Sequence, residues 1–216
     1  MIRYESRITY LAAGLAALAG FVDAVGYLNL GGYFVSFMSG NTTLFAVGLA
    51  GGARSALIAG GLIAVFVIGV ISGTLIGHFA GKRRASALLI CVATLLAIAA
   101  ALGMAGHMSL AAIAIALAMG TENAIFADND DVHIGLTYMT GTLVKMGQRL
   151  AGAMLGRARF AWWPYLALWL GLASGAVMGA IVYPLLGLNA LWLAALAALL
   201  FALLARNTNL NRRSEA

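Results

Sequence analysis

Long stretches without a charged side chain are the feature that most restricts how this chain can fold. From Leu57 to Phe79 there is no Asp, Glu, Lys or Arg, and Leu188 to Leu204 is equally apolar. A helix that crosses a bilayer needs about 20 predominantly apolar residues. Only 9% of the residues are charged, whereas soluble domains carry about 25%. The sequence therefore predicts an all-α polytopic membrane protein, with residues 1–216 as a single membrane domain. The other expected spans are Ile8 to Leu30, Ala85 to Leu102, Leu110 to Ala127 and Trp162 to Tyr183.

Two further segments, about Phe34 to Gly52 and Leu136 to Gly156, are apolar but interrupted by polar residues. Basic residues help to decide whether these segments cross, because Lys and Arg collect on the cytoplasmic side of a membrane. If neither crosses, nearly all basic clusters share one side and Arg54 alone lies on the other. If both cross, the Lys82–Arg84 cluster is placed on the wrong side. We expect six spans in a bacterial inner membrane, with both termini cytoplasmic. The net charge of +6 then reflects membrane orientation, and no nucleic-acid partner is expected.

The two halves of the sequence share an ordered set of matches. Gly20 and Asp23–Ala24 align with Gly120 and Asn123–Ala124, and Met38–Ser39–Gly40 aligns with Met139–Thr140–Gly141. We interpret this as an internal duplication, with repeat one at about 8–104 and repeat two at about 108–205. Three spans per half would make an inverted-topology 3+3 repeat with a broken or short extra helix in each half, as in many secondary transporters. The alternative is a 4+4 parallel repeat, with four spans per half.

The M-[ST]-G segments are the first candidate binding region. Ser, Thr and Asn side chains bond to backbone where a helix starts or breaks, and broken helices at matching positions mark the site in inverted-repeat transporters. We expect the two segments to face each other as broken or re-entrant helices. The alternative is two ordinary helix starts in which Ser and Thr serve as caps. The candidate residues are Ser39, Asn41, Thr42, Thr140 and Thr142.

Asp23 is the most informative single residue, because it lies well inside the first apolar run. A carboxylate at such a position is unfavourable by about 2.5–3.5 kcal/mol and needs a partner, water or a proton. Its counterpart is Asn123, beside Glu122. We predict that these residues belong to a substrate-binding or proton-binding site. The alternative for Asp23 is a structural hydrogen bond, for example to the backbone of the SGNTT stretch.

Two cations and two rows of glycines complete the candidate residues. Lys145 and Arg149 are four residues apart and share a helix face. This suits an anion site, a counter-charge for Asp23 or Glu122 or, as we favour, an amphipathic helix at the interface. Glycines spaced every four residues let helices approach closely, so we expect them to pack the two halves together or to form a dimer seam. The glycines are Gly69, Gly73, Gly77, Gly171, Gly175 and Gly179.

Catalytic and cofactor chemistry has no support in the sequence. Cys91 is the only cysteine, and His78, His107 and His133 lack ligand spacing. No nucleophile motif, phosphate loop or dinucleotide fingerprint is present. We expect no enzyme activity, no catalytic residues, no metal and no cofactor.

Specific motifs resemble those of a known family. The stretches "AGFVDAVGYLNLGGYFVSFMSGNTT", "GTENAIFAD" and "TYMTGTLVKMGQRLA" are similar to the YoaK family of bacterial inner-membrane proteins. The resemblance runs from about Ser6 to Leu204 and implies a domain of unknown function with about six spans. Glu122 departs from the family pattern, which has glutamine before the Asn–Ala pair. The positions that carry the resemblance are Gly20, Phe21, Asp23, Ala24, Ser39, Gly40, Asn41, Thr42, Asn123, Ala124, Thr140, Gly141 and Thr142.

The leading functional hypothesis is a small secondary transporter or exporter of an unidentified small molecule, with its site where the two repeats meet. Proton coupling and a homodimer in the lipid bilayer are part of this hypothesis. The alternatives are a channel, and a scaffold or lipid-handling membrane protein in which Asp23 only ties helices together.

Overall fold

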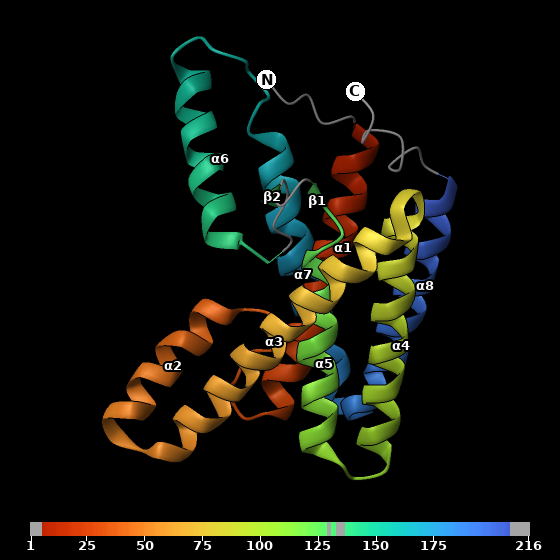
Figure 1. The fold of residues 1–216 in the computed structure, drawn as a ribbon. Coiled ribbons are helices and arrows are strands. Elements are labelled where there is room, and N and C mark those ends of the chain that lie inside the picture. Colours follow the sequence, from red (N-terminus) through yellow and green to blue (C-terminus); the bar gives the residue numbers. More distant parts are fainter. Residues whose placement is uncertain (1–5, 129–130, 133–136, 208–216) are drawn as a thin grey trace.

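The computed structural model describes residues 6–128, 131–132 and 137–207, and nearly all of these residues are helical (Figure 1). The only described strands are a two-residue antiparallel pair, β1 (Ala127–Asp128) with β2 (Asp131–Val132). The helices are α1 (Ser6–Asn29), α2 (Met38–Gly51), α3 (Ala53–Ala80), α4 (Arg84–Met104), α5 (Met108–Asn123), α6 (Met139–Met154), α7 (Trp163–Leu186) and α8 (Ala190–Asn207).

Three helical stretches of the described chain are long and apolar enough to cross a membrane: Thr9–Asn29, Arg54–Met104 and Trp163–Arg206. The second and third are hairpins, because short 3-10 turns at Gly81–Arg83 and Gly187–Asn189 reverse the chain (Figure 1). Gly81 and Gly187 adopt φ values of 50° and 56°, a region that suits glycine. The prediction of an all-α membrane protein with several long apolar helices is confirmed. The fourth predicted span, Leu110 to Ala127, ends earlier than expected, because α5 stops at Asn123.

Glycine rows join the two long pairs of helices. On α7, Gly171, Gly175 and Gly179 lie so close to α1 that an added Cβ would overlap backbone carbonyls of Ala13, Ala17 and Phe21. The order is the same along both helices, so α1 and α7 run parallel. The contact of α3 with α5 is built in the same way, since Gly69 meets the Leu117 carbonyl and Gly73 meets Thr121. Gly77 is an exception to the expected row, because it faces the Arg84 side chain on α4.

The centre of the bundle is the contact between α4 and α8, which run antiparallel. Ser86, at the start of α4, donates a hydrogen bond to the Ala202 carbonyl near the end of α8. Gly103, at the end of α4, packs against Leu188 just before α8 begins. Small residues line this seam and let the backbones approach. They are fully or almost fully buried: Ala93, Ala99, Ala100, Ala194, Ala198 and Ala202.

The short helices α2 and α6 lie outside this bundle of long helices (Figure 1). The α2 helix forms a hairpin with α3 at one end of the molecule, and α6 stands beside α7 towards the other end. The α1 helix begins, and α8 ends, at the same end of the bundle. The relation of the two halves as a repeat stays a prediction.

Candidate functional site

The chain doubles back beside α1 after that helix ends. Asp23 lies one and a half turns before the end of α1, and its Oδ1 accepts hydrogen bonds from the backbone N–H of Val35 at 2.9 Å and of Ser36 at 2.8 Å. At a rise of 1.5 Å per residue, this places the loop about 9 Å back from the end of α1. The segment before α2 therefore folds back along the last turns of α1, and Asp23 holds it there.

Asn41 holds the same loop from the α2 side. Its side chain is fully buried and forms two bonds with the backbone of Phe34: the amide donates to the Phe34 carbonyl at 2.6 Å and the oxygen accepts the Phe34 N–H at 3.0 Å. Backbone outside a helix lacks the hydrogen bonds that a helix provides, and these two side-chain bonds supply them at Phe34. Asn41 and Asp23 thus organise the loop as structural groups.

The second half has a similar but sparser arrangement. Asn123, in the last turn of α5, donates to the Met119 carbonyl at 2.9 Å and accepts a hydrogen bond from the Thr137 hydroxyl at 3.1 Å. Thr137 precedes α6 as Ser36 precedes α2. The Asn123–Thr137 bond therefore corresponds to the contact between Asp23 and Ser36.

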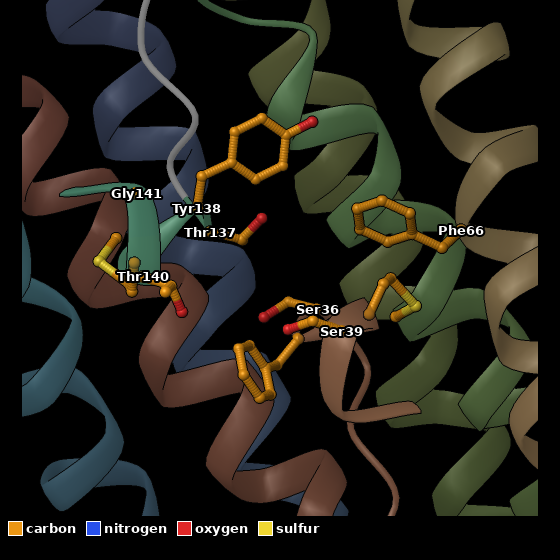
Figure 2. Close-up of a pocket in the computed structure, with 10 residues that line it drawn as sticks. Ser36, Ser39, Phe66, Thr137, Tyr138, Thr140 and Gly141 are labelled. Atoms are coloured by element: carbon orange, nitrogen blue, oxygen red, sulfur yellow. The ribbon is translucent and has the colours of Figure 1, made fainter. Parts of the chain in front are cut away.

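A cavity of about 240 Å³ lies between the starts of α2 and α6 (Figure 2). Figure 2 shows the hydroxyl-bearing side chains of Ser36 and Ser39 on one side and of Thr137 and Thr140 on the other. The wall contains residues from α2, α3 and α6 with the loops that precede α2 and α6. They are Ser36, Phe37, Met38, Ser39, Phe66, Thr137, Tyr138, Met139, Thr140 and Gly141.

The described residues of the cavity wall offer hydroxyl groups and aromatic rings but no carboxylate, ammonium or guanidinium. Both helices start at the cavity without a side-chain cap, so the interpretation of Ser39 and Thr140 as caps is wrong. A helix N-terminus carries a partial positive charge and leaves its first N–H groups unbonded within the helix. The wall can therefore donate hydrogen bonds to a small polar molecule and pack rings against its apolar part.

The predicted site residues divide into those that line the cavity and those that do not. Ser39 and Thr140 line it. Thr42 and Thr142 bond back to the carbonyls of Met38 and Tyr138, one turn earlier in their own helices. The residues outside the wall are Asp23, Asn41, Thr42, Glu122, Asn123, Thr142, Lys145 and Arg149.

Lys145 and Arg149 are both exposed on α6 and lie beyond the cavity wall. Their surroundings suit the amphipathic helix that we favoured over an anion site. They therefore give no reason to expect a charged substrate.

The predicted M-[ST]-G motifs contain only half of the residues that form the cavity wall. Ser36 and Thr137 are buried hydroxyl residues, and Phe37 and Tyr138 are the rings that precede each methionine. The signal was present in the sequence as S-F-M-S-G and T-Y-M-T-G, because the match between the halves begins two residues before each methionine. Phe66 had no such signal, because it comes from the middle of α3.

Glu122 differs from the other predicted site residues, because its buried side chain has no hydrogen bond among the described residues. It is 0% exposed, and neither carboxylate oxygen has a hydrogen-bond partner among the described residues. Among the described residues, no group of three or more His, Cys, Asp or Glu side chains could hold a metal ion.

Comparison with known proteins places the chain in a family. Residues 11–204 match the family described as "Protein of unknown function (DUF1275)". The chain is 39% identical over 191 residues to the "UPF0700 transmembrane protein RA0705" of Rhizobium meliloti (strain 1021), an alignment that covers 88% of this chain and 82% of that protein. No solved structure matches. The chain belongs to the DUF1275 family of membrane proteins, in agreement with the resemblance noted from its motifs.

Proposed function

We propose that this member of the DUF1275 family is a small secondary transporter whose substrate binds in the cavity between the starts of α2 and α6. The observation that carries the proposal is the composition of the wall: each half supplies a hydroxyl residue, a ring, a methionine and a second hydroxyl residue in the same order. These are Ser36–Ser39 from one half and Thr137–Thr140 from the other. A carrier built from two related halves binds its substrate where they meet.

The directions of the helices support an inverted relation between the halves. The first long helix of each half packs parallel to the third helix of the other half, as α1 with α7 and α5 with α3. The counterpart helices α4 and α8 run antiparallel. If α2 and α6 do not cross, three crossings per half reproduce these directions. If they did cross, α4 and α8 would run parallel.

Matching contacts support the same relation at the level of single residues. Gly20 lies against the backbone of Leu172 and Ala176, and its counterpart Gly120 lies against that of Phe66 and Val70. By sequence, Gly69 and Gly73 align with Gly171 and Gly175. The contacts instead pair Gly69 with Gly175 and Gly73 with Gly179, one helical turn further along. Glycines that recur every four residues fit either register, so spacing alone does not distinguish them.

The lining favours a small uncharged polar substrate. A volume of about 240 Å³ lies below the 300–1,000 Å³ typical of sites for drug-sized molecules. The proposal includes a location in the inner membrane with both termini in the cytoplasm, a homodimer as the assembly, and no catalysis.

Thiol accessibility tests the proposal without knowledge of the substrate. Single cysteines replace Ser39 or Thr140 in a Cys91→Ser background, and a membrane-impermeant maleimide is added to one side of reconstituted vesicles at a time. Two controls are Ile71→Cys, which is exposed on the apolar surface of α3, and Ala93→Cys, which is buried between α4 and α8. Neither control should react.

For a carrier, Ser39→Cys and Thr140→Cys each react from one side at a time, and saturable flux of a substrate from a panel of uncharged metabolites follows. Simultaneous reaction from both sides would indicate a channel and contradict the proposed carrier. If neither cysteine reacts while the protein remains folded, the cavity is sealed and the proposal is wrong.

A further inference from the structure

Glu122 occupies a position that the first half of the chain fills with an apolar residue. The alignment that pairs Asp23 with Asn123 pairs Val22 with Glu122, and both side chains are 0% exposed. Val22 belongs to the apolar core. The second half therefore places a carboxyl group in a setting suited to valine, and an ionisable residue kept within a membrane domain marks a functional site.

The carboxyl group of Glu122 is bonded to no counter-charge among the described residues. Among the described residues, neither of its oxygens has a hydrogen-bond partner. Arg84 is the cation whose contacts come nearest along α5, but its guanidinium donates to the Ala124 carbonyl. Among the side chains that the structure describes, the titratable groups on the helices that pack against α5 are Tyr10, Asp23 and Tyr27 on α1, Arg54 and His78 on α3, and Arg84 and Cys91 on α4.

An ionised carboxylate without a partner is unfavourable by several kcal/mol in such a place. Asp23 differs, because two backbone N–H groups stabilise its carboxylate. The two acids that the sequence offers for proton coupling are thus distinguished by their surroundings. Asp23 is a structural acceptor, whereas neither carboxyl oxygen of Glu122 is bonded among the described residues.

Glu122 is also linked to the cavity through its neighbour. Asn123 accepts a hydrogen bond from Thr137, and Thr137 lines the cavity. Ionisation of Glu122 would require water or a cation to reach the last turn of α5, and this turn positions Asn123. A change at Glu122 is therefore transmitted to the cavity wall through one side-chain contact.

We propose that Glu122 is the proton-binding site of this protein, occupied in the conformation described here and emptied when water reaches the last turn of α5. The inference rests on the proposed transport function and names its coupling ion. It assigns Asp23 to the framework of the loop.

Dicyclohexylcarbodiimide, an apolar reagent that modifies protonated carboxyl groups within membranes, tests this assignment. Purified full-length protein in lipid is treated over a range of pH, and the modified residue is identified by peptide mass spectrometry. The chain has only seven acidic residues, so the assignment is direct. We expect modification of Glu122 that declines as the pH is raised, loss of this modification in Glu122→Gln, and its persistence in Asp23→Asn.

Three results would overturn the proposal: no modification of Glu122, modification at Asp23 in its place, or modification of Glu122 that does not change with pH while the protein stays folded. The last result would indicate a permanently neutral structural residue. If Glu122→Gln fails to fold, Glu122→Asp keeps the test available, because it retains the carboxyl group and should still be modified. The readout does not depend on transport, so failure here leaves the thiol accessibility of Ser39→Cys and Thr140→Cys as a separate test of the proposed function.

Discussion

The segments that lead into α2 and α6 border the same cavity but differ in the hydrogen bonds of their described residues. In the first, Asp23 accepts two backbone N–H groups and Asn41 forms two bonds with Phe34. In the second, the described bonds that tie the approach to α6 are the single contact of Thr137 with Asn123 and the short-range turn bonds at the helix start. Among the described residues, the wall formed by the first segment is therefore bonded at more points than the wall formed by the second.

The packing of the two short helices shows the same difference. Gly48 of α2 lies so close to α3 that an added Cβ would be 2.5 Å from the Ala56 nitrogen, and Gly60 of α3 packs on Phe45. An added Cβ at Gly141 or Gly147 of α6 would meet nothing within 4 Å. In a carrier with inverted halves, the cavity would open to the opposite side if α6 became as closely packed as α2 is here and α2 became as loosely packed as α6. The unequal packing therefore suggests α6 as the element that moves.

Removal of the acid that holds the first loop gives the largest expected effect. Asp23→Ala leaves the N–H groups of Val35 and Ser36 without their acceptor, and each bond to a charged group contributes about 1.5–3 kcal/mol. We expect a loss of about 3 kcal/mol in the free energy of unfolding, measured by denaturant titration in detergent. The matched variant Asn123→Ala should lose only about 1 kcal/mol. Equal losses would contradict the difference between the segments.

Alanine at one glycine of each short helix should give effects of opposite sign. Gly48→Ala forces α2 away from α3 and should destabilise the protein by about 1–3 kcal/mol. Gly147→Ala fills open space on a helix and should stabilise it by up to about 1 kcal/mol through helix propensity. Thermal unfolding of both variants in one detergent checks this prediction. A destabilising Gly147→Ala would show that α6 is packed more closely than described.

Amide hydrogen exchange should report the same asymmetry in the unmodified protein. Amides in the first turns of α6 should exchange roughly tenfold faster than those of α2, a difference of about 1.4 kcal/mol in the free energy of local opening. Mass spectrometry of peptides that cover each helix start provides the measurement. Exchange that is equally slow in both peptides would remove α6 as the moving element.

Neutral replacement of the α6 cations should have the smallest effect. Lys145 and Arg149 are exposed, and surface substitutions away from specific contacts change stability by less than about 0.5 kcal/mol. The double variant Lys145→Gln with Arg149→Gln should therefore unfold like the parent and keep the thiol accessibility of Thr140→Cys. Loss of that accessibility would assign the two cations to the site after all.

The sequence was a good guide to elements and a partial guide to the site. Uncharged apolar runs predicted the long helices within a few residues, because membrane crossing depends on length and composition alone. The repeated M-[ST]-G motif lies where the two short helices start beside the cavity, and Ser39 and Thr140 line this cavity. It pointed less well to Thr42, Thr142, Lys145 and Arg149, because helix faces are assigned by packing and the motif specifies only the chain position.

By itself the sequence determined that this protein lies in a membrane and that polar residues interrupt its helices at two matching places. Lipid excludes charged and unbonded polar groups, so composition is enough to decide both points. Only the tertiary structure decided which acid is bonded and which is not. In the sequence, Asp23 and Glu122 are both acids within an apolar run. Only the folded chain brings the N–H groups of Val35 and Ser36 to Asp23. The structure also decided the register of the glycine contacts, because a four-residue spacing fits several registers and only the packed backbones select one.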